Sequence, residues 1–206
     1  WASKARLASN PRVAVVGDVL RYAQGASQGD TELDGFINYH WLMSPNGLAQ
    51  PKIMLEAGIN APTEVAGPDG SRRALIAIRS SPWKAGHETN PWHDEFDLDH
   101  GHVRYFGDHK PSTSGLPGAT KGNRLLLEAA RLHSGTTRRE GLRPPPLFLF
   151  RAVTVYRGGR ALVKGHVEFC GVAVIERLEH VVQRDPDTGR SFPNLSLDLA
   201  VIRGTD

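Results

Sequence analysis

The C-terminal part of the chain is a succession of strand-like segments, and this pattern most restricts what the chain can fold into. After the rigid run 144–146 (P-P-P), segments rich in β-branched and aromatic residues are separated by turns that contain glycine. We predict strands over 147–156, 163–169, 172–183 and 192–202, with turns at 157–160 and 185–189. Upstream, 51–60 and 72–79 have the same character and are predicted to be a hairpin or adjacent strands, with a turn at 68–70.

Only one segment has a strong helical pattern. From Asn123 to His133 apolar residues recur at helical spacing, and Gly135 provides a C-terminal stop. Strands greatly outnumber helices, and no repeat with a period of about 20–50 residues is present. We therefore predict a single α+β domain built on a curved sheet or barrel. The 206 residues, 39% of them hydrophobic, are enough for a sizeable core.

Composition sets only broad limits on function. A formal net charge of +3 and a pI near 9.2 permit binding to nucleic acid without requiring it. The single cysteine, Cys170, lies in an apolar run, so we expect a small buried residue, no disulfide and a reducing compartment. No apolar run approaches the roughly 20 residues that span a bilayer. We predict a cytoplasmic protein without a membrane partner, and the first residue, Trp1, suggests a fragment of a longer chain.

The segment from Trp83 to Lys121 has an unusual composition. Between Trp92 and Phe106 aromatic residues are interspersed with carboxylates, and arginines and lysines lie on both flanks. A planar polar ligand would find stacking faces in the aromatic residues and acceptors in the carboxylates, while the cations could bind phosphates. This combination suits an unstacked nucleic-acid base. The alternative is an ordinary core with a solvated acidic loop, because aromatic residues are mostly buried and acidic residues mostly exposed.

His100 and His102 suggest a different function, a metal-dependent barrel enzyme. Imidazoles at i and i+2 of a strand point to the same side, as metal ligands can. Arg104 follows closely and would be unfavourable beside a cation, so we expect polar turn histidines and predict no metal or cofactor. The chain also lacks a Glu-x-Lys sequence, a His-Asn-His pattern with framing cysteines, and Gly-x-Ser-x-Gly, Walker A and dinucleotide motifs. We therefore predict no catalytic residues in it.

Four ordered segments resemble the SRA (SET- and RING-associated) domain, which reads modified cytosine. They are L-E-A-G-I-N-A-P (55–62), V-A-G-P-D-G-S-R-R-A-L-I-A-I-R-S-S (65–81), D-E-F-D-L-D-H-G-H-V-R-Y-F-G-D (94–108) and K-G-N-R-L-L (121–126). The resemblance implies an SRA/PUA-like curved β-barrel with a few flanking helices over 50–206, and 1–49 as an N-terminal extension packed on it. The start of the helix and P-P-L-F-L-F-R (145–151) are most similar to bacterial SRA domains attached to HNH nucleases of the McrA type, which restrict modified DNA.

The resemblance further implies that the domain flips 5-methylcytosine out of double-stranded DNA into a pocket. In the family, an aspartate two residues before D-H-G accepts a hydrogen bond from the cytosine amine, and by position this is Asp97. Cytosine N4 is a donor, so an acceptor there is chemically sensible. One aromatic wall corresponds to Tyr105, whereas the other aligns with Asp94 and would have to be replaced by a neighbouring aromatic residue. The predicted base pocket is Asp97, Tyr105, Trp92, Phe96, Phe106 and Gly107, the last two supplying backbone groups and room for the base.

DNA backbone and finger contacts are predicted from the flanking polar residues. The loops 108–120 and 60–68 are candidates to fill the gap that a flipped base leaves. The predicted contacts are Arg72, Arg73, Arg79, Lys84, Arg104, Lys110, Ser112, Lys121 and Arg124. We expect a nuclease domain elsewhere on the same polypeptide, a bacterial and nucleoid-associated setting, and compatibility with a homodimer. A reader of 5-hydroxymethylcytosine or of another DNA mark is the alternative within this class.

Overall fold

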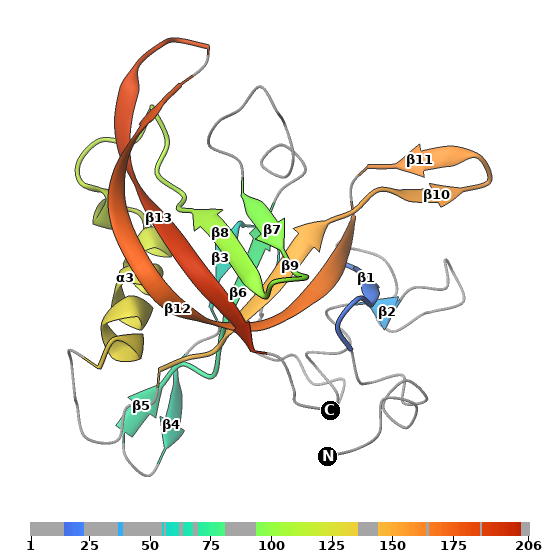
Figure 1. Cartoon of the computed structure of the whole chain (residues 1–206), viewed down its shortest axis with the longest axis horizontal. Coiled ribbons are helices and arrows are strands. Elements are labelled where there is room, and N and C mark those ends of the chain that lie inside the picture. The colour runs from blue at the N-terminus through green and yellow to red at the C-terminus, as the bar shows by residue number, and fades with distance from the viewer. Residues whose placement is uncertain are drawn as a thin grey trace.

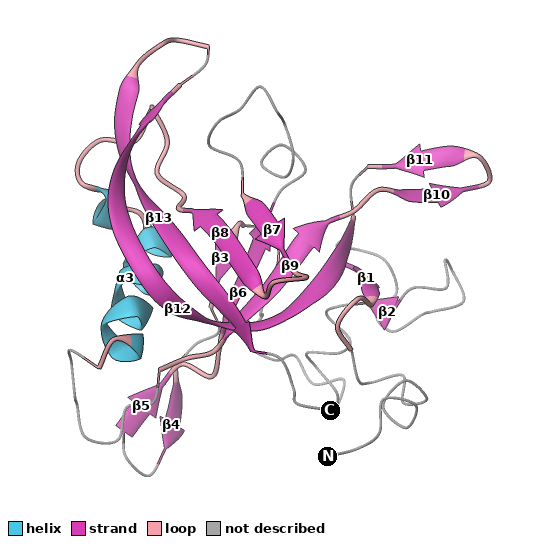
Figure 2. Ribbon diagram, viewed as in Figure 1, coloured by secondary structure: helices cyan, strands magenta, loops and turns pink. Residues whose placement is uncertain are grey.

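A strongly curved sheet and one helix dominate the part of the chain that the structure describes (Figures 1 and 2). The computed structural model describes residues 15–22, 37–38, 55, 57–61, 64–67, 70–80, 94–135, 144–163, 165–185 and 187–202. The elements are β1 (Val19–Arg21), β2 (Ile37–Asn38), β3 (Ile59–Asn60), β4 (Val65–Gly67), β5 (Gly70–Arg72), β6 (Ile76–Ser80), β7 (Glu95–Asp97), β8 (His102–Phe106), the 3₁₀ helix η1 (Pro117–Ala119), α3 (Lys121–His133), β9 (Leu147–Ala152), β10 (Val155–Arg157), β11 (Arg160–Leu162), β12 (His166–Arg184) and β13 (Ser191–Ile202).

The main sheet has nine strands and is open. Its order is β3-β6-β9-β12-β13-β8-β7, with β1 pairing β12 and β2 pairing β1. The strands β3 and β7 are therefore its two ends, and the sheet curves without closing. The pairs β6–β9 and β1–β2 are parallel, whereas the other pairs in this sheet are antiparallel. The predicted α+β class with a curved sheet is confirmed. The described part of segment 1–49 contributes β1 and β2 to this sheet.

Strand β12 differs from the sequence prediction. We expected two strands with a break near Gly171, but 19 residues form one continuous strand. Gly171 has a φ of 119°, and the register against β9 shifts between Phe169 and Gly171. A second shift, against β13, lies between Ile175 and Arg177. Such irregularities bend a strand without ending it, which is why a glycine that looks like a break does not stop pairing. Conversely, the predicted strand 147–156 is divided into β9 and β10, and 72–79 contains the end of β5 and most of β6.

Apolar side chains cover both faces of the sheet around β6. Ile76 and Ile78 belong to the larger core cluster, which also includes Leu126 of α3, whereas Ala77 belongs to a smaller cluster on the opposite face. This is the alternation expected of a strand. Cys170 is part of the larger cluster, and burial raises the pKa of its thiol to about 12, so the expectation of a buried apolar cysteine is confirmed. Among the described helices, none is long and apolar enough for a membrane crossing.

The predicted helix is confirmed as α3, which begins two residues earlier than expected. Thr120 caps it, because its side chain accepts a hydrogen bond from the Asn123 N–H. At the other end His133 joins the helix to the sheet: its Nδ1 accepts from the Ile175 N–H at 2.8 Å, and its Nε2 lies 3.1 Å from the Pro145 carbonyl oxygen. One nitrogen must accept and the other must donate, so the imidazole is neutral in the folded protein.

We predict that His133 makes the fold sensitive to mild acid. Burial lowers the pKa of His133 below its ordinary value of 6.5, despite the opposing effect of the Pro145 carbonyl. As the pH falls, the unfolded chain takes up this proton first. The contribution of neutral His133 to the free energy of unfolding is therefore complete above about pH 6.5. It is lost as the pH falls through the lower pKa that His133 has in the folded protein. The melting temperature of the parent should fall more between pH 7.5 and pH 5 than the melting temperature of the His133→Ala variant.

The control for this prediction is His180→Ala, which removes an exposed histidine of β12. It should retain the pH dependence of the parent. At pH 7.5, His133→Ala should cost about 1–3 kcal/mol, because the N–H of the buried residue Ile175 loses its acceptor. Equal pH dependence in all three proteins would contradict the role given to His133.

Candidate nucleic-acid interface

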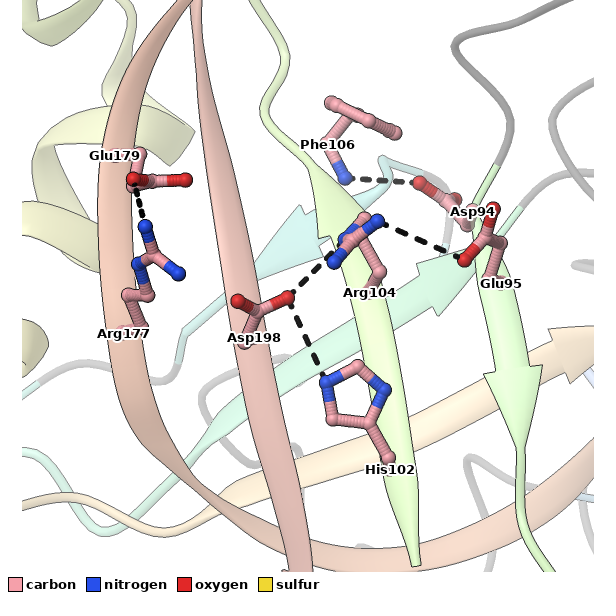
Figure 3. A network of polar contacts seen from close by, with 8 residues as sticks. All are labelled: Asp94, Glu95, His102, Arg104, Phe106, Arg177, Glu179 and Asp198. Carbon is pink, nitrogen blue, oxygen red and sulfur yellow. Dashed lines mark hydrogen bonds and ion pairs between the residues drawn. The ribbon is translucent and has the colours of Figure 1, made fainter. Parts of the chain in front are cut away.

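A buried carboxylate joins two strands that are not neighbours in the sheet. Asp94, just before β7, is only 2% exposed. Its Oδ1 accepts a hydrogen bond from the Phe106 N–H at 2.9 Å, and its Oδ2 accepts from the Ser80 hydroxyl at 2.7 Å. Figure 3 shows the first of these bonds, at the end of β8. A charge at this depth is tolerated only with such partners. The ends of β6 and β8 thus hold a carboxylate in a fixed position.

Strand alternation separates the carboxylates of this segment. Phe96 packs against the larger core cluster, and Asp94, two residues earlier, is buried as well. Glu95 and Asp97 are exposed and pair in register with Arg104 and His102 of β8. Because successive side chains of a strand point to opposite faces, the inner face carries Asp94 and Phe96, and the outer face carries Glu95 and Asp97.

Asp97 is therefore placed differently from the resemblance-based expectation of an interior acceptor. Its carboxylate oxygens lie 2.8 and 2.9 Å from His100 Nδ1, in the exposed turn that follows β7. This hydrogen bond is the largest contribution that lowers the pKa of Asp97. His102 instead lies 3.5 Å from Asp198, which also accepts a hydrogen bond from Arg104 at 3.1 Å (Figure 3). The two histidines thus belong to separate acidic pairs, and no three His, Cys, Asp or Glu side chains of the described segments gather as a metal site requires.

Tyr105 lies in the core and not on an open wall. It is 1% exposed, and burial raises its pKa well above 10, followed by the effects of the Asp94 and Asp108 carboxylates. Its hydroxyl thus stays protonated at neutral pH. That hydroxyl is 3.0 Å from the position a Cβ on Gly58 would occupy. A larger residue in place of the glycine of the E-A-G segment would therefore crowd the Tyr105 hydroxyl.

The space beside Gly107 is filled by the protein itself. A Cβ on Gly107 would lie 2.8 Å from both Asn123 Cγ and Asn194 Oδ1. The Gly107 N–H donates to the Leu195 carbonyl oxygen, and its own carbonyl oxygen accepts from Asn194 Nδ2 at 3.1 Å. Both backbone groups of Gly107 are thus hydrogen-bonded within the protein, and its place in a base pocket stays a prediction. The Phe106 N–H is likewise used by Asp94.

Both ends of the loop 108–120 are fixed at the start of α3. The Asp108 N–H donates to Asn123 Oδ1 at 2.8 Å, and Asp108 Oδ1 accepts from the Asn123 N–H at 3.2 Å and from the Thr120 hydroxyl. A Cβ on Gly122 would lie 2.9 Å from Asp108 Cγ, so only glycine admits this approach. These contacts give the K-G-N-R segment its role, which the sequence-based site prediction missed. Asn194, an amide that is buried in β13, was the available signal.

The described arginines among the predicted contacts lie on different elements of the fold. Arg73 lies 3.1 Å from Glu64, the Arg79 guanidinium stacks 5.0 Å from the centre of the Tyr22 ring, and Arg104 is on the outer face. Four of the predicted contacts are exposed and lie on the loop 108–120 or at the start of α3: Lys110, Ser112, Lys121 and Arg124. The Arg72 side chain, Lys84 and Trp92 lie outside the described residues.

Comparison with known proteins gives a family match over most of the chain. The family model described as "Restriction endonuclease AspBHI N-terminal" matches residues 21–194. The solved structure of the MspJI restriction endonuclease in complex with a 27-mer oligonucleotide is 82% identical, with a TM-score of 0.82. The match covers 98% of this chain and 45% of that chain. The present chain therefore spans about half the length of MspJI. No curated protein sequence matches.

More distant structures have the same fold. The DNA recognition domain of the cytosine modification-dependent restriction endonuclease LpnPI is 18% identical, with a TM-score of 0.58, and the match covers 91% of this chain and 73% of that one. The DNA modification-dependent restriction endonuclease AspBHI is 21% identical, with a TM-score of 0.50 over 72% and 63% of the two chains. The SRA-like fold expected from the resemblance is thus confirmed, whereas the narrower McrA-type placement is not.

We predict that Gly107→Ala destabilises the protein by about 1–3 kcal/mol or more, because the new methyl group would collide with two hydrogen-bonded amides. Gly118→Ala is the matched control, since its Cβ would meet only the flexible end of Leu127, at 3.0 Å. Urea unfolding of the three proteins measures the difference. If Gly107→Ala were as stable as Gly118→Ala, the amide packing around Gly107 would not be as tight as described.

Proposed function

Since the chain belongs to the restriction endonuclease AspBHI N-terminal family, we propose that it is the part of a modification-dependent restriction enzyme that reads modified cytosine in double-stranded DNA. The modification is 5-methylcytosine, and the base is read after flipping out of the duplex, because its Watson–Crick edge is otherwise paired. The high identity to MspJI, a restriction endonuclease whose structure was solved in complex with an oligonucleotide, supports DNA as the partner.

The position of the Asp94 carboxylate is the main support for this proposal. It is an interior carboxylate at the end of the sheet, and Ser80 and Phe106 hold it in place. Cytosine would present its N4 donor to such a group, whereas thymine would present the O4 acceptor and be repelled. We therefore assign the acceptor role to Asp94 and not to Asp97, which faces outward.

The loop 108–120 is proposed as the finger that fills the place of the flipped base. It leaves β8 directly after Phe106, at the Asp94 end of the strand, and Asp108 and Thr120 bind to each other at its two ends. Leu116 on this loop is 79% exposed. An apolar side chain on a fixed loop suits insertion into the base stack, and the exposed Lys110 on the same loop would bind a phosphate.

DNA cleavage is assigned to another part of the polypeptide. The match covers 45% of MspJI, which leaves ample length for a nuclease domain in a full-length enzyme. Neither the family model nor the MspJI structure specifies an HNH nuclease, so that class rests on the McrA-type resemblance alone. Action on cellular DNA implies the bacterial cytoplasm, and pairing into a homodimer would place two such readers on one duplex.

We predict that Asp94→Asn and Asp97→Asn separate the two assignments. The substitutions are chemically identical and lie three residues apart, on opposite faces of the strand. Asp94→Asn keeps an acceptor for the Phe106 N–H but presents an amide donor to the cytosine amine. Its preference for methylated over unmodified duplex should fall by about ten-fold or more, with weak salt-sensitive binding retained. Asp97→Asn should behave like the parent.

Competition gel shifts with matched duplexes that carry unmodified, methylated or hydroxymethylated cytosine measure this preference. Loss of the preference only in Asp97→Asn would return the acceptor role to Asp97. An intact preference in both variants would exclude recognition through either carboxylate. If the parent preferred the hydroxymethylated duplex, 5-methylcytosine would not be the mark that it reads.

A further inference from the structure

The hairpin β10–β11 stands apart from the main sheet. Its two strands pair only with each other within the described residues, and Figure 1 shows them extending away from β9 and β12. Gly158 and Gly159 connect them, with φ values of 54° and 77°. Positive φ at both central residues is the requirement of a tight type I′ turn. The hairpin is therefore a narrow two-stranded ribbon with a glycine tip.

The side chains of this ribbon are unfavourable for an isolated hairpin. Tyr156 is 76% exposed and faces only Ala161 across the pair. Arg157 lies directly opposite Arg160, and like charges in such a pair repel each other. Both arginines are exposed, and residues 152–167 include no Asp or Glu. An isolated two-stranded hairpin is at best marginally stable in water. The exposed tyrosine and the facing arginines therefore do not stabilise the fold, whereas the positive charge of the arginines suits a polyanionic partner.

The hairpin leaves the sheet at the same end as Asp94. It follows β9, in which Arg151 lies beside Ser80 of the parallel strand β6. Ser80 is the residue whose hydroxyl binds Asp94. The chain then returns from the hairpin into β12 at His166. A duplex that offered a base to Asp94 would thus pass along the side of the sheet from which the hairpin projects.

We propose that the β10–β11 hairpin enters the major groove of the DNA beside the modified base. The inference rests on the proposed function and adds a second contact region to it. The major groove, about 12 Å wide, admits a two-stranded ribbon, whereas the minor groove is about 6 Å wide. Arg157 and Arg160 bind phosphates at the groove edge and guanine N7 and O6 within it. Tyr156, on the other face, packs against the sugar-phosphate wall.

Charge removal at the tip tests the contact. We compare Arg157→Gln, Arg160→Gln and their combination with Arg177→Gln, an exposed arginine of β12 that pairs with Glu179. The double variant should bind both methylated and unmodified duplexes on the order of ten-fold more weakly at moderate salt. The slope of log K against log salt should shrink by about 0.9 for each phosphate contact that is lost. Arg177→Gln should match the parent. The melting temperature of the double variant should equal or exceed that of the parent, because a repulsive pair has been removed.

Dimethyl sulfate footprinting tests the groove, because this reagent methylates guanine N7 in the major groove and adenine N3 in the minor groove. The parent should protect guanine N7 beside the modified base, and the double variant should not. Parent-like affinity and salt slope in the double variant would overturn the proposal, as would protection confined to adenine N3. The same titrations measure the preference of the parent for the methylated duplex, and this preference tests the proposed function. The two tests are separate, because the hairpin contact is expected on both the methylated and the unmodified duplex.

Discussion

The bend of β12 is the constraint on which the rest of the structure depends. This strand is hydrogen-bonded to β1, β9 and β13. It also binds the end of α3, because its Ile175 N–H donates a hydrogen bond to His133. Because it bends, β6 and β8, which lie four positions apart in the sheet order, approach closely enough for Asp94 to bind both. The backbone pairing leaves the sheet open, and a buried carboxylate supplies a polar connection across its interior.

The placement of that carboxylate shows what a resemblance can and cannot transfer. The order of the motifs is conserved well enough to identify the fold, and the family match agrees with it. The side to which a residue points depends on its parity along a strand, and Asp94 and Asp97 have opposite parity. Asp97 therefore lies on the outer face and Asp94 on the inner one, although both belong to the segment that carries the resemblance.

Much of the fold follows from local patterns, whereas the site depends on long-range contacts. The helix is predictable because its apolar period and its stop are local, and the turn at Gly158–Gly159 is predictable because glycine tolerates positive φ. The continuity of β12 is not predictable from local patterns, because it depends on the strands that pair with β12 on both sides of Gly171. The role of Gly107 also escapes prediction, since the amides that occupy its surroundings come from α3 and β13. Arg157 and Arg160 were identified only as parts of a turn, because their opposition across the ribbon requires the register.

The separation of the β10–β11 ribbon from the main sheet has an evolutionary consequence. Residues of the two core clusters are constrained by their packing, so substitutions there change stability first. The exposed positions of the ribbon carry no such constraint. With the major-groove contact proposed for the ribbon, related proteins could vary this short segment to favour other DNA sequences, while the scaffold and its buried carboxylate stay unchanged. For the same reason, the ribbon is a natural place to graft foreign sequences when a reader with a different target is wanted.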